Sequence, residues 1–180
     1  MAAERDVARW LEACGKALAK HDIAGATLLF DTECYWRDLV SFTWTIKTFE
    51  GRDEVKAMLA ATLNSTKPVG FVPLGPAVEA NGAVESWFAF ETEVGRGTGH
   101  LRLKNGKCWT MLTTLQELKG YEEKAGHARE RGVDHGVHPD RLSWAERRRV
   151  AQAEFGVERQ PYVVIIGGGQ GGLALAARLK

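Results

Sequence analysis

The sequence predicts an α+β domain, then a polar linker, and finally the strand, turn and helix that open a second domain. Three observations lead to this prediction. Apolar residues recur at helical spacing over much of residues 6–63. Two Asn-Gly pairs then separate strand-like runs, as in β-hairpins. Near the end, a glycine-rich turn stands between a β-branched run and a run of strong helix formers.

Three helices are expected in the first part of the chain. Between Asp6 and Lys20 the apolar residues form one stripe, made of Val7, Trp10, Leu11, Cys14 and Leu18. Asp22 can cap a second helix over Ile23–Phe30, because its carboxylate can accept from the N–H groups two or three residues later. A short extended segment, Cys34–Leu39, follows. A third helix is predicted from about Arg52 to Leu63.

The pattern then changes to strands. Asn81-Gly82 and Asn105-Gly106 suit type I′ turns, in which both central residues need positive φ. They join four strands into two hairpins: Phe71–Ala80 with Ala83–Val94, and Thr98–Lys104 with Lys107–Leu118. A curved antiparallel sheet of about four long strands follows, and helices gathered on one face of it would make an α+β domain.

The glycine-rich turn follows the strand-like run Val163–Ile166. Gly167, Gly169 and Gly172 stand in the order G-x-G-x-x-G, the fingerprint of a dinucleotide-binding βαβ unit. The first glycine permits a tight turn, the second lets the backbone approach a pyrophosphate, and the third lets helix and strand pack closely. The N–H groups at the start of the helix would hold the diphosphate. The cofactor-binding residues expected are Gly167, Gly168, Gly169, Gln170, Gly171 and Gly172.

A second glycine cluster, Gly95-Arg-Gly97-Thr-Gly99-His100, begins in the same way. His100 takes the place of the third glycine, and a strand-like Leu-Arg-Leu follows instead of a helix. We therefore reject it as a nucleotide-binding turn.

The acidic residue that should hold the ribose, about 20 residues after the fingerprint, would lie past Lys180. The second strand of the unit would lie there too. We therefore expect this chain to be the front part of a longer protein, cut inside its first nucleotide-binding unit. By itself it is not expected to bind the cofactor.

The first domain resembles the nuclear-transport-factor-2-like (NTF2-like) cone fold, which includes the polyketide-cyclase-like domains. The resemblance covers roughly Asp6–Gly120 and rests on the element order together with Tyr35-Trp36-Arg37-Asp38 and Phe49-Glu50-Gly51-Arg52. With Gln160-Pro161-Tyr162 and the glycine turn added, the chain resembles the N-terminal part of flavin-containing monooxygenases that carry such a domain ahead of their FAD domain.

This resemblance implies three parts: a cone domain at 1–118, a linker at 119–160 and the start of a Rossmann-type FAD domain at 161–180. The linker should hold a short helix near 143–155, because Ser143-Trp-Ala-Glu146 is a capping box and Gly156 can end the helix.

The resemblance also implies an activity. In the full-length protein FAD would bind at Gly167–Gly172, and NADPH would reduce the flavin so that oxygen is activated to oxygenate a small organic substrate. The missing C-terminal FAD and NAD(P) domains would be its partners, and the fragment alone would be inactive.

Two alternatives remain open for the cone domain. It could be a non-catalytic dimerisation or ligand-binding module, with a homodimer formed through its sheet. It could instead be an isomerase or hydrolase, with Asp38 as the base and Tyr35 as the oxyanion donor in the cone pocket.

Composition limits the other possibilities. With 44% hydrophobic and 26% charged residues and a net charge of +1, the chain is typical of a globular cytoplasmic protein and carries no nucleic-acid footprint. No signal peptide or membrane-spanning run is expected. Cys14, Cys34 and Cys108 suggest reduced thiols. His135-x-x-His138 lacks further ligands, so no metal site is predicted.

Overall fold

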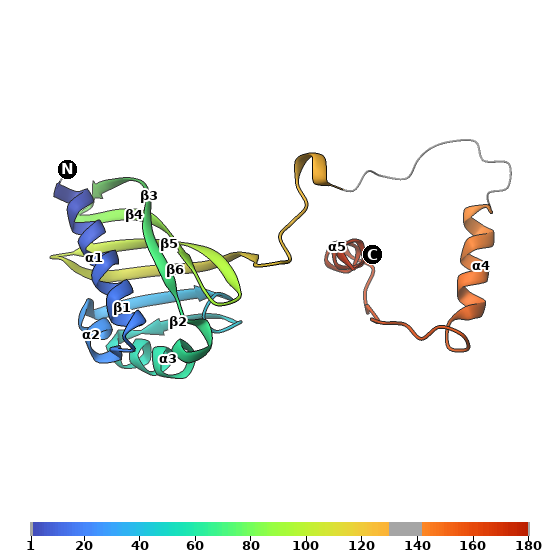
Figure 1. Ribbon diagram of the computed structural model, residues 1–180, viewed down its shortest axis with the longest axis horizontal. Coiled ribbons are helices and arrows are strands. Elements are labelled where there is room, and N and C mark those ends of the chain that lie inside the picture. The colour runs from blue at the N-terminus through green and yellow to red at the C-terminus, as the bar shows by residue number, and fades with distance from the viewer. Residues whose placement is uncertain (1, 130–141, 180) are drawn as a thin grey trace. The chain divides into compact units, whose positions relative to one another are not determined.

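The computed structural model describes residues 2–129 and 142–179 (Figure 1). The chain divides into two compact units, Met1–Arg129 and Glu130–Lys180, which are described separately. The main elements of the first unit are, in chain order, α1 (Ala2–Ala19), α2 (Ile23–Leu28), β1 (Phe30–Leu39), β2 (Ile46–Glu50), α3 (Gly51–Thr66), β3 (Val69–Ala80), β4 (Ala83–Glu91), β5 (Gly95–Lys104) and β6 (Lys107–Leu118).

The three predicted helices are confirmed, with shifted ends. α1 buries the predicted stripe, namely Val7, Trp10, Leu11, Cys14 and Leu18. Asp22 caps α2 by accepting from the N–H of Gly25 at 2.8 Å. α2 ends earlier than predicted because Phe30 already belongs to β1, where it is fully buried. α3 runs past Leu63 and ends where Lys67 adopts a left-handed φ of 40°.

Both predicted hairpins are confirmed. Asn81 and Gly82 have φ angles of 51° and 72°, and Asn105 and Gly106 have 49° and 74°, as a type I′ turn requires. The sheet, however, has six strands in the order β2-β1-β6-β5-β4-β3, which is two more than predicted.

The prediction of a wholly antiparallel sheet was wrong. The segment predicted as a short extended piece is a ten-residue strand, β1, which pairs antiparallel with β2 and parallel with β6. This pairing joins segments about 75 residues apart, such as Asp38 and Thr113. No local turn signal specifies it, so it depends on how the rest of the chain packs.

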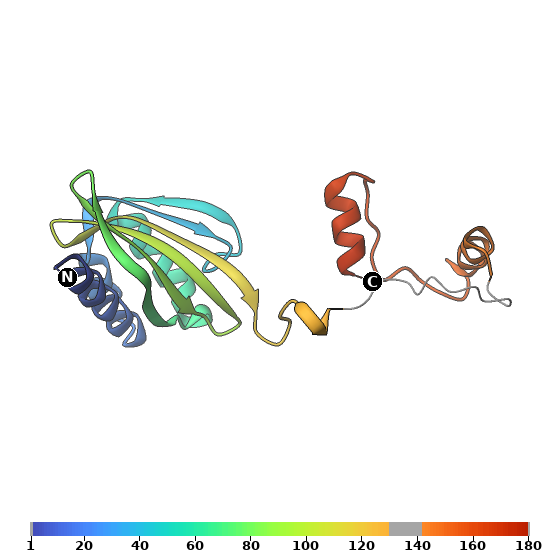
Figure 2. The ribbon, with the colours of Figure 1, turned by 90° about the horizontal axis from the view of Figure 1, so that it is seen from above.

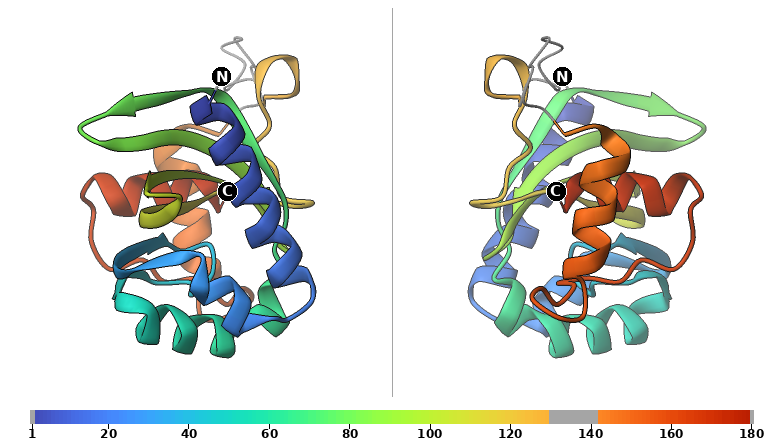
Figure 3. Two further views of the ribbon diagram at one scale, coloured as in Figure 1. Left: turned by 90° about the vertical axis from the view of Figure 1, so that its left-hand side faces the viewer. Right: turned by 90° about the vertical axis from the view of Figure 1, so that its right-hand side faces the viewer.

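The curved sheet holds its helices on one side (Figures 2 and 3). α1 contacts β3 and β4, and α3 contacts β1 and β2. Between them lies a series of rings in successive contact: Trp10, Phe30, Trp36, Phe42, Phe90, Phe71 and Phe88. Burying each large apolar side chain stabilises the fold by about 1.5–3 kcal/mol, so this aromatic series is the centre of the α+β domain.

The second unit contains α4 (Trp144–Glu154) and α5 (Gln170–Arg178). The capping box that begins α4 is confirmed, because the Ser143 hydroxyl accepts from the Glu146 N–H while the Glu146 carboxylate accepts from the Ser143 N–H. The strand predicted at Val163–Ile166 is not formed. A strand needs a hydrogen-bonded neighbour, and within residues 142–179 this segment has none.

Candidate functional site

The two residues considered for acid–base catalysis are not brought together. Side chains alternate along β1, so Asp38 points to the helix side and is fully buried, whereas Tyr35 points to the other side and is 42% exposed. A catalytic base and an oxyanion donor must contact the same bound substrate, close to its reacting atoms. Because they lie on opposite faces of the sheet, Asp38 and Tyr35 do not form such a pair.

The Asp38 carboxylate is satisfied by internal donors. Oδ1 accepts from the hydroxyls of Ser41 and Thr113 and, at 3.3 Å, from the Ser41 N–H. Oδ2 accepts from the N–H groups of Phe42 at 3.0 Å and Thr43 at 2.9 Å, and from the Thr43 hydroxyl at 2.9 Å. These six bonds occupy the lone pairs of both oxygens, which leaves little capacity to accept a substrate proton.

These hydrogen bonds hold the turn between β1 and β2. Val40 and Trp44 in this turn have φ angles of 57° and 56°, which are unfavourable for a β-branched and a bulky residue. Asp38 offsets that strain from inside the domain. The turn leaves the Trp44 side chain 59% exposed.

The face of the sheet opposite the helices is here called the outer sheet face. Within residues 2–129, no helix packs on it. Its large apolar side chains are between 42% and 66% exposed, and they are Tyr35, Ile46, Val72, Leu74, Val78 and Trp87. The alternation of side chains along a strand predicts some of these outward positions from the sequence. It does not predict which strands are neighbours in the sheet.

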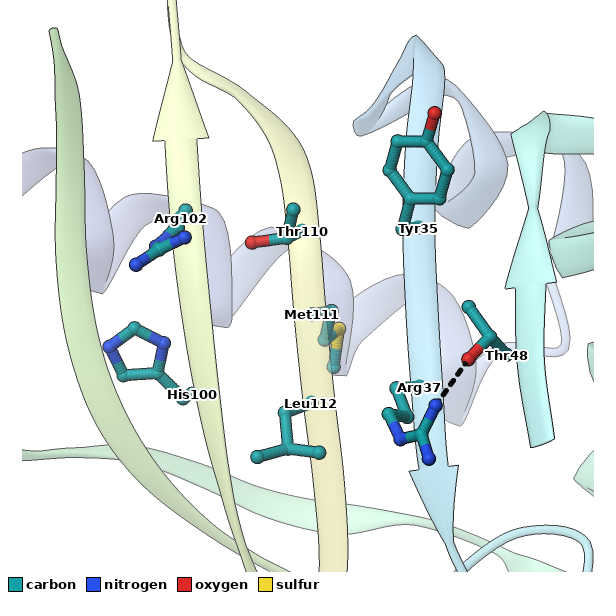
Figure 4. Close-up of a pocket in the computed structure, with 8 residues that line it drawn as sticks. All are labelled: Tyr35, Arg37, Thr48, His100, Arg102, Thr110, Met111 and Leu112. Carbon is teal, nitrogen blue, oxygen red and sulfur yellow. Dashed lines mark hydrogen bonds between the residues drawn. The ribbon is translucent and has the colours of Figure 1, made fainter. Parts of the chain in front are cut away.

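The outer sheet face contains a pocket of about 350 Å³ over β1, β2, β5 and β6 (Figure 4). It is lined by Tyr35, Arg37, Thr48, His100, Arg102, Thr110, Met111 and Leu112. Arg37 and Tyr35 stand on β1, and His100 and Arg102 stand on β5, with β6 between them. The parallel pairing of β1 with β6 brings these basic residues to one site, and sequence reasoning missed Arg37 for that reason.

Only part of the positive charge in this pocket is neutralised. Arg102 Nε lies 3.0 Å from Glu85 Oε1, although its N–H is not aligned for a hydrogen bond. His100 Nε2 lies 3.7 Å from the same carboxylate. Arg37 donates from Nη1 to the Thr48 hydroxyl at 3.0 Å, and no carboxylate among the described residues forms an ion pair with it.

Burial lowers the pKa of His100 and the nearby Arg102 lowers it further, while Glu85 opposes both. Because the neutral imidazole is favoured, His100 contributes no full charge near pH 7. Its ring lies 4.8 Å from that of Trp87, centroid to centroid.

A second hollow of about 380 Å³ lies further along the same face, over β3 to β6. Its charges are paired within the chain. Arg96 lies 3.0 Å from both Glu117 and Glu122, and Lys119 lies 2.8 Å from Glu91. The unpaired Arg37 therefore distinguishes the first pocket from the second.

The rejected cluster at residues 95–99 packs the core. A Cβ placed on Gly97 would lie 2.5 Å from Phe90 Cζ, and one on Gly99 would lie 2.2 Å from Phe88 Cζ. The rings of Phe90 and Phe88 therefore pack directly on the backbone of Gly97 and Gly99. These glycines therefore serve packing, and β5 starts at Gly95, earlier than the predicted Thr98.

The turn at Gly167–Gly172 has the sterics expected of its first and third glycines. Gly167 has a φ of 119°, and a Cβ on Gly172 would lie 2.0 Å from the Gly167 carbonyl oxygen. Gly169 is the N-cap residue of α5, whose first hydrogen bond runs from the Leu173 N–H to the Gly169 oxygen. A Cβ on Gly168, Gly169 or Gly171 would meet nothing within 4 Å. The turn therefore leaves room beside the free N–H groups that begin a helix.

Other candidate chemistry finds little support in the described residues. The three cysteines are free and buried, and burial raises the pKa of the Cys14 thiol to about 12. Residues 2–129 and 142–179 contain no cluster of three potential metal ligands. His135 and His138 lie outside the described residues. No described helix has the length and apolar character needed to span a membrane.

No protein-family model matches the sequence, and no curated protein matches it. Solved structures of NTF2-like proteins are similar in fold. One of unknown function from Burkholderia pseudomallei is 13% identical over 62% of this chain and 91% of its own, with a TM-score of 0.47. Another, from Burkholderia xenovorans, is 14% identical over 76% and 100%, with a TM-score of 0.49.

A Mycobacterium tuberculosis protein is 12% identical over 60% of this chain and 89% of its own, with a TM-score of 0.47. At such identities the likeness concerns the fold alone. The first unit is an α+β domain with a curved sheet, similar to NTF2-like proteins. The resemblance to flavin-containing monooxygenases stays a prediction.

Proposed function

We propose that the first unit is a non-catalytic assembly module that pairs with a second copy of itself through the outer sheet face. The observation that carries this proposal is the uncovered sheet itself. Exposed apolar side chains gathered on one uncovered face are typical of an interaction site. Trp87, Tyr35 and Arg37 belong to the residue types that dominate binding energy at protein interfaces.

The packing on the helix side of the sheet agrees with this proposal. The rings of Trp36, Phe42, Phe88 and Phe90 are all at most 2% exposed and pack together between the sheet and the helices. Asp38, the one buried carboxylate there among the described residues, already accepts six hydrogen bonds. A structural role for Asp38 accounts for these contacts without a substrate.

A second copy suits this face because it could supply Arg37 with the carboxylate neighbour that the described residues of its own chain do not give it. Arg37 lies on β1, toward one edge, whereas Glu85 and Glu91 lie on β4, toward the other. In a twofold pair the same surface meets itself. An axis near the central strands β5 and β6 would bring Arg37 of each copy toward β4 of the other, where the Glu85 and Glu91 carboxylates, each beside a cation of its own chain, would share it.

Sedimentation velocity over a range of concentrations tests the pairing. Trp87→Gln removes a half-exposed ring from the outer sheet face and should weaken dimerisation at least about thirtyfold, as expected for an interface hot spot of about 2 kcal/mol. Leu28→Gln is the matched control, because Leu28 is 59% exposed but lies on α2. A chain that stays monomeric at every concentration, or equal weakening by both substitutions, would refute the proposal.

A second candidate function concerns the other unit. We infer from the glycine turn that Pro161–Lys180 opens an FAD-binding domain, in a longer flavin- and NADPH-dependent oxidoreductase acting on a small organic substrate. Gly167 and Gly172 support a close turn, and the first N–H groups of α5 would face a diphosphate. When bound, the flavin would supply the redox chemistry; the residues present here would only orient its diphosphate.

The FAD-binding proposal is tested by sequencing the gene beyond codon 180 and by measuring flavin absorbance of the extended protein. The reading frame should continue past Lys180 with a second strand ending in an acidic residue, and the extended product should show flavin absorbance that Gly172→Ala abolishes. The 180-residue chain should stay colourless. A stop directly after Lys180, or an extended product with no affinity for adenine dinucleotides, would contradict it.

A further inference from the structure

The pocket on the outer sheet face has basic side chains on two facing sides. In Figure 4, Tyr35 and Arg37 rise from β1, and His100 and Arg102 rise from β5. The strand between them, β6, contributes Thr110 and Leu112 to the floor. Across β6, Arg37 is level with Leu112 and His100, whereas Arg102 is level with Thr110 and Tyr35, so the two arginines are diagonal neighbours.

The charges of this pocket sum to one unit of positive charge. Arg37 and Arg102 contribute two, Glu85 removes one, and His100 is taken as neutral. Glu85 is fixed beside Arg102 and His100, so it occupies one end of the basic cluster. Arg37 has no carboxylate partner among the described residues and keeps donors available beyond its bond to Thr48. A single negative charge would balance the pocket, whereas a doubly charged group would meet repulsion from Glu85.

The rest of the lining is largely apolar. Met111, Leu112 and the ring of Tyr35 border the space, and the Trp87 ring stacks at an angle against His100 beside it. A volume of about 350 Å³ lies at the small end of the range for ligand pockets. It would hold one aromatic ring or a short aliphatic body.

We propose that this pocket binds a small monocarboxylate with an aromatic or apolar body. The carboxylate would lie against Arg37, whose guanidinium keeps donors beyond its bond to Thr48 and can match two oxygens, while Arg102 adds positive charge from the diagonal position. The body would lie on Leu112 and Tyr35. Nothing in this arrangement requires a bond to be made or broken, so the site is one of binding.

The pocket lies on the face proposed for pairing, yet the inference does not depend on the pairing. In a monomer the pocket is open to solvent. In a pair the ligand would either be enclosed or compete with the second copy. Binding and assembly must therefore be measured by different methods on the same samples.

The test uses benzoate as the probe and the 180-residue chain. Titration calorimetry is run at two protein concentrations tenfold apart, with sedimentation velocity on each sample. Benzoate should bind, and neutral benzamide, which has nearly the same shape, should bind at least about tenfold more weakly, because an arginine binds a carboxylate more strongly than a neutral amide. Inorganic phosphate should also bind more weakly than benzoate.

Two variants place the site. Arg37→Met should weaken benzoate binding at least about tenfold. Arg9→Met is the matched control, because Arg9 is exposed on α1, on the helix side, and it should leave the affinity unchanged. In an NMR titration of the parent chain with benzoate, the amide resonances of Thr110 and Leu112 should shift. Those of the turn between β4 and β5, residues 92–94, should not.

Equal affinity for benzoate and benzamide would overturn the proposal, and so would unchanged binding in Arg37→Met. Tighter binding of phosphate would refute the monocarboxylate class. Absence of benzoate binding at both concentrations would refute the site itself. A chain that binds benzoate but never dimerises would contradict the pairing alone, and a chain that dimerises without binding would contradict this inference alone.

Discussion

Gly99→Ala should destabilise the first unit by about 3 kcal/mol, at the upper end of the cost of overpacking a core. The added Cβ would lie 2.2 Å from Phe88 Cζ and 2.5 Å from the Leu112 carbonyl oxygen, where ordinary contacts begin at 3.4 Å. It would thus overlap both neighbours by about an ångström. Phe88 is fully buried against Phe71 and Phe90, and the Leu112 carbonyl belongs to the β5–β6 pairing, so neither can move freely.

Gly15→Ala is the matched control, because the same methyl is added elsewhere. Its Cβ would lie 3.4 Å from Phe71 Cδ2, which is ordinary contact, and Gly15 lies inside α1. Alanine is more favourable than glycine in a helix interior by about 0.5–1 kcal/mol. This variant should therefore be more stable than the parent, whereas Gly99→Ala is less stable.

Urea denaturation of both variants and the parent, followed by tryptophan fluorescence at one protein concentration, measures these changes. The slope of unfolding free energy against urea should stay the same, because the surface exposed on unfolding hardly changes. If Gly99→Ala unfolds at the same urea concentration as the parent, the packing of Phe88 on the β5 backbone is wrong.

Three further results are expected. Asp38→Asn should lower the unfolding free energy by about 3 kcal/mol, because the NH2 of the asparagine amide would face N–H and O–H groups that now donate to the carboxylate. An unchanged melting temperature would contradict the structural role of Asp38. Burial and Arg102 lower the pKa of His100 below its usual 6.5, against the opposing Glu85. As pH falls below that value the unfolded state binds the proton first, so the parent should lose stability relative to His100→Gln. An NMR titration that finds the pKa of His100 at 6.5 or above would refute this. Finally, burial raises the pKa of Cys14 to about 12, so iodoacetamide at pH 8 should label it in urea but hardly in buffer, and rapid labelling of the native chain would contradict the burial.

Several elements were predictable because their signals are local. The stripe from Val7 to Leu18 places α1 on the core, and the Asp22 cap needs only the next three residues. The Asn-Gly turns set both hairpins by their own backbone preference. The capping box at Ser143 likewise begins α4 within one turn.

The candidate site was less predictable, because it is assembled across the sheet. Strand alternation relates His100 to Arg102, which are two residues apart. Arg37 joins them only because β1 lies parallel beside β6, and no turn signal indicates that pairing. Asp38 was a candidate base because the cone fold would give it a pocket, yet its donors include Thr113, which only the folded chain brings near.

The sequence by itself therefore determined the helices, the two hairpins and the glycine turn, since each depends on residues within a few positions of one another. The tertiary structure decided which strands are neighbours, which face of the sheet stays uncovered and what surrounds each charge. Those features depend on hydrogen bonds and burial between segments far apart in the chain, and such contacts exist only after the whole domain has packed.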